Sequence, residues 1–504
     1  MKNALTILSI FVLSNAFSQG GYEIKISIKN FTDSVAYLAK YNFGKQYLVD
    51  TCKKVNKGNI AFKGKRDLDK GIYFLVNQQK NHMFDFIINE NTKLNFTSDM
   101  ADLQFNLKSV GSKENEDFFA YTRFFMEKNK AFSDLRNKTK GMNKEDSTKF
   151  MNEKAKEFTK EVTKFEADVV AAQKGKFFGD WLNLKTEKEV KDADMPQLKN
   201  ATDSAFYRFN YYKNHYWDGI NFSDDRLLRT QFLETRVNKY FDQLIQQLGP
   251  DSVIVEMDKV LKMCPPQSEM FKYMFVYFMV NYENHKLMGF DKVFVHLVDN
   301  YIKTKKAYGI YDEKTIEKII EKSDKIKPLL IGSIAPDLML IDTINGKIVN
   351  KMGFDTAQTS ESVTKLYYAN MQKITPMYKP LSSIKAKYTV LIFWDVECGH
   401  CQTEMPKLVE VYHDLKKKTD IQVVAVYTLQ EFEKWRKYII SKKLDFINLY
   451  DPVYINNMKS KYDIFSTPKV FILDEKKAII AKHMPVEKIP ELIEIHESKF
   501  KTNK

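Results

Sequence analysis

Two cysteines three positions apart, Cys398 and Cys401, form the segment of this chain with the most definite chemistry. They enclose Gly399 and His400 in a Cys-Gly-His-Cys motif. Cysteines at i and i+3 in the first turn of a helix lie on one face, so their sulfurs can form a disulfide with little backbone movement. The motif therefore predicts a redox-active dithiol.

The flanking sequence predicts how the two sulfurs are positioned. Residues 388–394 (YTVLIFW) have the β-branched and aromatic composition of a buried strand, and from Gln402 apolar residues recur at helical spacing. Cys398 should then stand just before a helix, where unpaired N–H groups and the helix dipole favour thiolate over thiol. We expect Cys398 to be the nucleophile and Cys401, one turn inside the helix, to be the more buried, resolving thiol.

The residues around the dithiol also bear on its potential and on metal binding. The imidazole of His400 stabilises a nearby thiolate, which makes the disulfide a better oxidant than a Gly-Pro dipeptide would. The alternative interpretation is half of a zinc site, but the only other cysteines, Cys52 and Cys264, are isolated. We expect no metal and no cofactor, and we expect these two cysteines to be small buried hydrophobes, with a bridge between them left open.

Residues 1–18 predict a secretory signal peptide. A short basic start precedes an apolar core at 4–13, and a small-x-small cleavage site ends at Ser18. The core is too short to span a membrane, and no later segment has the ~18 consecutive apolar residues of a transmembrane helix. Because Gln19 rather than a cysteine follows, nothing indicates a lipid anchor. We expect export to the bacterial periplasm, with no transmembrane segment in the mature chain.

The net charge of +14 raises the question of a nucleic-acid partner. Lysine and glutamate alternate along predicted helices, for example at 152–157, which is typical of solvated faces. No nucleic-acid recognition motif is present, so we expect no such partner.

The length of 504 residues favours about three domains. Residues 19–108 alternate short apolar runs with turn residues, which predicts a small all-β, sandwich-like domain. Residues 109–330 show helical spacing and predict an all-α domain. Its aromatic segments 206–212 and 271–282 could line a groove, but large aromatics dominate interior packing, so we expect them in the core. Residues 331–504 alternate strands and helices, as an α/β domain does.

The last block also contains a Gly-x-x-Ala-Pro-Asp entry at Gly332, Ala335, Pro336 and Asp337, then Phe393-Trp394, the dithiol, Glu404-x-Pro406 and Thr467-Pro468. By these motifs it resembles the TlpA/ResA-like branch of the thioredoxin superfamily, whose members are exported thiol–disulfide oxidoreductases. The first two blocks resemble, by composition and order, domains that precede thioredoxin modules in exported Bacteroidetes proteins.

The resemblance implies roles for several residues. Pro468, after Thr467, should form a cis peptide bond, face the dithiol and help to dock the substrate. Glu404 should tune the cysteines and relay protons, although a plain surface glutamate fits its position equally well. Trp394, ahead of the dithiol, should likewise help to tune the cysteines or to dock the substrate.

Two features depart from the family pattern. Glu397 stands where tryptophan is frequent, and its negative charge should oppose a low thiolate pKa. Residues 350–379 form a longer connection than usual, which predicts either an insertion beside the site or surface decoration.

The function expected from these observations is disulfide exchange with protein substrates, with a membrane protein as electron donor. The resemblance favours reduction, whereas Gly-His between the cysteines favours isomerisation or oxidation. One alternative is an envelope binding or scaffold protein with a secondary redox module. A thiol peroxidase fits less well, because Asp395 occupies the position at which peroxiredoxins have threonine.

Overall fold

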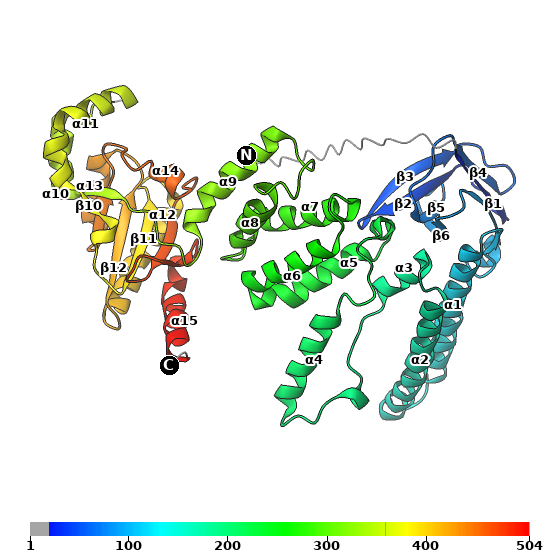
Figure 1. Ribbon diagram of the computed structural model, residues 1–504. Helices are drawn as coiled ribbons and strands as arrows, with labels where there is room; N and C mark the ends of the chain where they lie inside the picture. Colours follow the sequence, from blue (N-terminus) through cyan, green and yellow to red (C-terminus); the bar gives the residue numbers. More distant parts are fainter. Residues whose placement is uncertain (1–19, 358, 503–504) are drawn as a thin grey trace. The chain divides into compact units, whose positions relative to one another are not determined.

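The computed structural model describes residues 20–357 and 359–502, with the backbone alone from Lys499 onward. The predicted signal peptide lies outside the described residues. Along the described chain, an N-terminal β region precedes a helical region and a C-terminal α/β domain with a thioredoxin-like sheet, as predicted (Figure 1). None of the helices in these ranges is long and apolar enough to cross a membrane.

The chain forms two compact units. One holds the chain up to Leu248 together with Asp258–Tyr273, and the other holds Gly249–Met257 and the chain from Met274. The helical region thus contributes to both units. The domain boundaries 19–108, 109–330 and 331–504 stay a prediction.

The N-terminal β region consists of two four-stranded sheets that share an aromatic core. Phe96 of one sheet packs against Phe84 and Phe86 of the other, with ring centroids 6.3 and 4.9 Å apart. In sheet order the strands are β4 (Asn59–Gly64), β1 (Tyr22–Lys29), β7 (Lys93–Asp99) and β8 (Lys108–Val110), then β3 (Lys45–Cys52), β2 (Ala36–Asn42), β5 (Gly71–Val76) and β6 (His82–Ile88).

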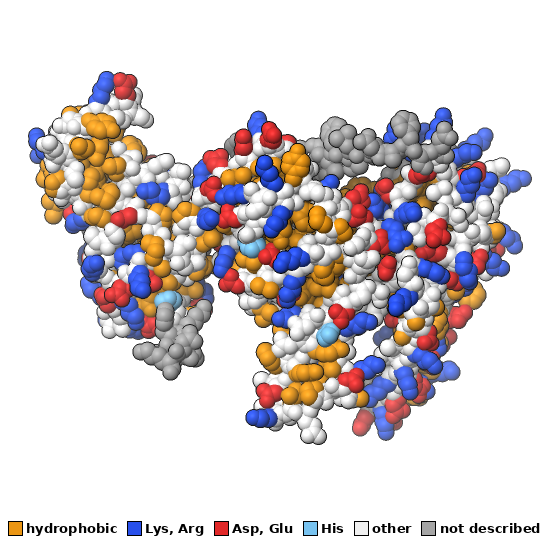
Figure 2. Space-filling model, viewed as in Figure 1, with side chains coloured by type: hydrophobic (Ala, Val, Ile, Leu, Met, Phe, Trp, Pro, Cys, Tyr) orange, Lys and Arg blue, Asp and Glu red, His pale blue; other side chains and the backbone are white. Residues whose placement is uncertain are grey.

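The helical region differs from the prediction in one respect. Helix α7 (Glu269–Glu283) buries four of its aromatic side chains and leaves Tyr273 and Tyr277 half-buried. By contrast, α4 (Ala201–His215), which carries residues 206–212, buries none, and Phe206 is 67% exposed. Apolar side chains gather on the surface of α4 (Figure 2). The helices are α1 (Lys113–Lys138), α2 (Lys144–Ala172), α3 (Phe177–Lys185), α4 (Ala201–His215), α5 (Leu233–Asn238), α6 (Pro250–Met263), α7 (Glu269–Glu283), α8 (Asp291–Leu297) and α9 (Glu313–Ile326).

The C-terminal domain is built on a seven-stranded sheet. Strand β11 lies between β12, to which it is parallel, and β14, to which it is antiparallel, and all seven of its residues are buried. In sheet order the strands are β10 (Lys379–Pro380), β9 (Met339–Asp342), β13 (Ile447–Tyr450), β12 (Ile421–Tyr427), β11 (Tyr388–Trp394), β14 (Lys469–Leu473) and β15 (Ile479–Lys482).

Helices cover both faces of this sheet. On one face α12 (Gly399–Lys416), α13 (Phe432–Lys442) and α15 (Ile489–Thr502) share an apolar cluster with β11 and β12. On the other face, α14 (Met458–Lys461) contributes Met458 to a second cluster. The sheet is therefore a rigid support for the loops at its edges.

The long connection 350–379 packs on the first of these faces. It contains α11 (Ser360–Ile374), whose Val363 and Ile374 are buried in the cluster shared with α13. The preceding helix, α10 (Thr343–Val349), contacts α13 and β13, and the Tyr450 hydroxyl donates to the Gly346 carbonyl at 3.3 Å. The segment is thus a folded part of the domain.

Candidate active site

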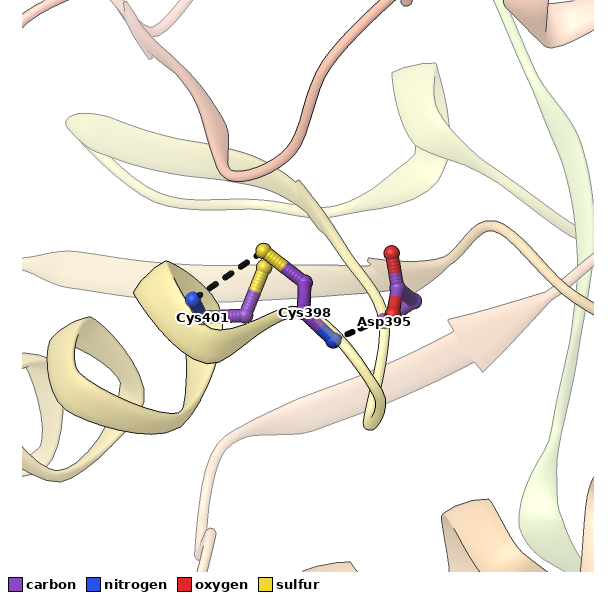
Figure 3. Close-up of side chains that lie close together, drawn as sticks. All are labelled: Asp395, Cys398 and Cys401. Carbon is purple, nitrogen blue, oxygen red and sulfur yellow. Dashed lines mark hydrogen bonds between the residues drawn. The ribbon is translucent and has the colours of Figure 1, made fainter.

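The two cysteines lie at the N-terminal end of α12, just after the loop that connects β11 to α12. Cys398 is the N-cap of α12, and its Sγ accepts a hydrogen bond from the Cys401 N–H at 3.3 Å. Both are free thiols, Cys398 half-buried and Cys401 fully buried. Figure 3 shows the two sulfurs side by side at the tip of the helix. The predicted placement on the first helical turn is thus observed.

Asp395 organises the loop before the dithiol. Its Oδ1 accepts hydrogen bonds from the backbone N–H groups of Glu397 and Cys398, at 2.9 and 2.7 Å. Its Oδ2 accepts one from the Thr467 hydroxyl at 2.8 Å. Sequence reasoning missed this role, although an aspartate followed by a helix N-cap is a familiar sign of a side-chain-to-backbone turn. One carboxylate thus ties the dithiol loop to a distant segment.

That distant segment contains the expected cis peptide bond. The bond between Thr467 and Pro468 is cis, as the resemblance implies. The Thr467 carbonyl accepts a hydrogen bond from the Cys398 thiol at 3.1 Å. The loop predicted to dock substrates therefore touches the sulfur predicted to attack them.

The environment drives the pKa values of the two thiols apart. Burial favours the neutral form of Cys398, but hydrogen bonding with the side chain and N–H of Cys401, together with the neighbouring Thr467, outweighs burial. The pKa of Cys398 is therefore lowered, although the Asp395 charge acts against the thiolate. For Cys401, burial dominates and raises the pKa to about 12. One sulfur is thus prepared to attack, while the other is held protonated.

The charged neighbours differ from those expected. Glu397 is exposed and pairs with Lys434, with Oε1 and Nζ 2.8 Å apart, so the carboxylate that acts against the Cys398 thiolate is Asp395. His400 is exposed on the first turn of α12, between the cysteines. His400 thus lies next to the cysteines, whereas the Glu397 carboxylate pairs with Lys434.

Glu404 lies on α12, three residues after Cys401, and Trp394 is the last residue of β11. The Glu404 carboxylate accepts hydrogen bonds from Lys407 at 3.0 Å and from the Val486 N–H at 3.2 Å. These bonds join α12 to the short 3-10 helix Val486–Lys488. Trp394 is fully buried at the end of β11. The hydrogen bonds observed for Glu404 thus connect two helices and do not involve the cysteines.

A metal ion could be held here only by an incomplete ligand set. Ligand atoms of Asp395, Cys398 and Cys401 lie within 4.8 Å of one another. Structural zinc sites usually have four protein ligands, and both carboxylate oxygens of Asp395 already accept hydrogen bonds. The arrangement fits thiol chemistry better than metal binding.

The other two cysteines lie outside this site. Cys52 and Cys264 are both buried and free. The Cys264 thiol donates to the Val260 carbonyl at 3.3 Å, and burial raises its pKa to about 12. Cys264 is therefore held as a neutral thiol.

Comparison with known protein families finds three separate matches along the chain. Residues 386–480 match a family model described as thioredoxin-like. Residues 22–118 and 141–324 each match a model described as a domain of unknown function. None of the curated proteins matches the chain.

Several solved structures resemble parts of the chain. A domain of a "possible thiol-disulfide isomerase" from Cytophaga hutchinsonii is 34% identical, covering 35% of this chain and 98% of that one, with a TM-score of 0.27. The thioredoxin domain of a thiol-disulfide oxidoreductase from Bacteroides vulgatus is 21% identical, covering 33% and 97%, with a TM-score of 0.25. A thioredoxin-like protein from Bacteroides caccae is 16% identical, covering 61% and 99%, with a TM-score of 0.33. Through its C-terminal domain, the chain belongs to the thioredoxin-like family.

Proposed function

We propose that this protein is an exported thiol–disulfide oxidoreductase that exchanges disulfides with protein substrates through Cys398 and Cys401. The observation that carries the proposal is the opposite tuning of two adjacent thiols. Cys398 is accessible and has a lowered pKa, whereas Cys401 is buried with a pKa of about 12. Such a pair separates the attacking thiol from the resolving thiol.

Each half of the exchange uses one of these sulfurs. The Cys398 thiolate attacks one sulfur of a substrate disulfide, and the other substrate sulfur leaves as a thiolate. Cys401 then loses its proton and attacks Cys398 Sγ, which breaks the mixed disulfide and releases the second substrate thiolate. Two electrons pass from the dithiol to the substrate, and the reverse sequence oxidises a substrate dithiol.

The loop around Pro468 supports a role in docking. The Thr467 carbonyl contacts Cys398, and the Thr467 hydroxyl is fixed by Asp395. A substrate sulfur that approaches Cys398 would therefore contact the backbone at Thr467, which hydrogen bonds to Cys398 and Asp395 hold in place. His400, exposed beside the thiols, would add positive charge near the thiolate when protonated.

The proposed function includes export of the protein to the periplasm and an electron donor for its dithiol. Residues 1–18 have the pattern of a signal peptide, which supports a periplasmic location. A dithiol that reduces substrates repeatedly must be reduced again, and a membrane-bound donor is the partner we propose for that step.

A trapping experiment tests the enzyme assignment. Replacing Cys401 with serine removes the resolving sulfur, so mixed disulfides with substrate proteins should accumulate at Cys398 and disappear on reduction. The matched control is the double variant Cys398→Ser, Cys401→Ser. If the single variant forms no more covalent adducts than the double variant, the assignment is wrong.

One observation favours a second candidate, a binding or scaffold protein. The aromatic side chains of α4 are half-buried or exposed, which suits contact with a partner. For such a protein the double cysteine variant should retain its partners without covalent bonds. The same pair of variants thus distinguishes the two candidates.

A further inference from the structure

The dithiol shares its end of the sheet with two other loops. Trp394, Tyr427 and Tyr450 end the parallel strands β11, β12 and β13 and lie next to one another in register. The loop that follows β13 and the loop that leads into β14 therefore emerge at the same edge as Cys398. Loops at the carboxyl edge of parallel strands are where such sheets bind their ligands.

Three large apolar side chains project from these two loops into solvent. Tyr454 is 58% exposed and Ile455 is 45% exposed, in the loop after β13. Phe465 is 85% exposed, two residues before Thr467, whose carbonyl contacts Cys398. Exposed aromatic and aliphatic side chains cost free energy in water, and groups of them mark interaction sites.

The loop after β13 is held rigidly in this exposed conformation. The buried Asp451 carboxylate accepts hydrogen bonds from the N–H groups of Ile455 and Asn456, at 3.2 and 2.9 Å. The Asn456 side chain exchanges two hydrogen bonds with the backbone of Met339, both at 2.7 Å. Tyr454 itself has a φ of 56°, a left-handed conformation that is unfavourable for a bulky residue. The exposure of these side chains is therefore built into the fold.

The loop before Pro468 is fixed in a similar way. Asp463 has a φ of 52°, and its carboxylate accepts a hydrogen bond from Lys469 at 3.0 Å. Lys469 also donates to the Asp463 carbonyl. Phe465 thus projects from a loop that is fixed at both ends, since Asp395 holds Thr467.

The sheet order places the strands next to these two loops on opposite sides of β11, the strand that leads to the dithiol. Strand β13 lies two strands from β11 on one side, and β14 lies next to β11 on the other. With neighbouring strands ~4.8 Å apart, β13 and β14 lie about 10 and 5 Å from β11. An extended chain advances ~3.3 Å per residue, so it covers these distances in about three residues and one to two residues.

On these grounds we infer that the protein selects cysteines carried in extended apolar segments of its substrate proteins. One apolar side chain of the segment, about three residues from the cysteine, contacts Tyr454 and Ile455. A second, one or two residues beyond the cysteine on the other side, contacts Phe465. The inference rests on the proposed function and specifies its substrates as unfolded or loosely folded polypeptides, in which such segments are accessible.

Synthetic peptides test this inference. Two peptides each carry one cysteine as a mixed disulfide with thionitrobenzoate, one with leucine at the two predicted positions and one with serine there. The reduced protein should release thionitrobenzoate about tenfold faster from the leucine peptide, because apolar side chains become buried on binding. Phe465→Ser and the double variant Tyr454→Ser, Ile455→Ser should each lower the ratio of the two rates.

The matched control is Tyr368→Ser, which removes a tyrosine that is 71% exposed on α11 and should leave the ratio unchanged. Equal rates for the two peptides with the unaltered protein would overturn the inference. So would a ratio that is unaffected by all of the loop substitutions. Exchange with glutathione disulfide, measured in parallel, separates these outcomes from a failure of the proposed function, in which neither the peptides nor glutathione disulfide would react.

Discussion

Replacing Asp395 with asparagine is the most informative perturbation of the site. Asparagine keeps an oxygen that can accept the hydrogen bonds from the N–H groups of Glu397 and Cys398, and its amide can donate to the Thr467 hydroxyl. The loop should therefore keep its shape while the negative charge is lost. Because that charge acts against the Cys398 thiolate, we expect the pKa of Cys398 to fall.

The separation of the groups sets the size of the effect. The Asp395 carboxylate oxygen lies within 4.8 Å of the sulfurs. At this separation two charges repel by about 0.9 kcal/mol at the dielectric constant of water, which is the lower limit for a site open to solvent. That energy corresponds to about a fivefold larger thiolate fraction at any pH below the pKa. Since nucleophilicity falls as the pKa falls, the observed rate should rise by only about twofold.

The assay is the rate at which iodoacetamide alkylates Cys398 as a function of pH, followed by peptide mass spectrometry. The variant should reach its half-maximal rate at a lower pH than the unaltered protein. Its alkylation rate should be higher below that pH, and its maximal rate at high pH should be about half that of the unaltered protein, because the thiolate is less basic.

The matched control is Glu397→Gln. Glu397 is exposed and paired with Lys434, so its charge should have little effect on the thiol. A pH profile that Asp395→Asn leaves unchanged or moves upward would refute the electrostatic reasoning. A larger downward movement for Glu397→Gln than for Asp395→Asn would refute it as well.

Three further predictions concern neighbouring groups. Thr467→Val removes the hydrogen bond to Asp395 and should lower the free energy of unfolding by ~1 kcal/mol, measured by urea denaturation, and an unchanged value would contradict the role of that bond. Glu404→Gln should leave the pH profile of Cys398 alkylation unchanged, because the carboxylate bonds to Lys407 and the Val486 N–H, and a moved profile would restore the tuning role implied by resemblance. In the unaltered protein, Cys398 should be alkylated at lower pH than an ordinary thiol, whereas Cys401, with a pKa of about 12, should stay protected near neutral pH; equal labelling of both would contradict the assignment of the two roles.

Local sequence patterns predicted the parts of the site that depend on local structure. The composition of residues 388–394 predicted a buried strand, and β11 spans the same residues. The spacing of the two cysteines predicted their place on the first turn of α12. The cis bond before Pro468 followed from the family resemblance, because an isolated Thr-Pro pair favours trans.

The remaining features depend on contacts between segments that are distant in the chain. Asp395 acts through Thr467, which lies 72 residues away, and Glu404 is engaged by Val486, 82 residues away. The aromatic residues of α4 have the composition of a core, but tertiary packing leaves them half-buried or exposed. Sequence patterns show which side chains are apolar or charged, whereas tertiary packing determines which partner each one meets.

The measurement that tests the central claim most directly is a redox titration of the Cys398–Cys401 pair. The protein is equilibrated with graded ratios of reduced to oxidised glutathione, the free thiols are alkylated, and the labels are counted by mass spectrometry. We predict that both cysteines lose their labels together in one two-electron transition, with a potential between about −270 and −120 mV. Thiols that stay reduced at every ratio, or that become glutathionylated separately without forming a bond to each other, would contradict the claim that these two sulfurs form a reversible disulfide.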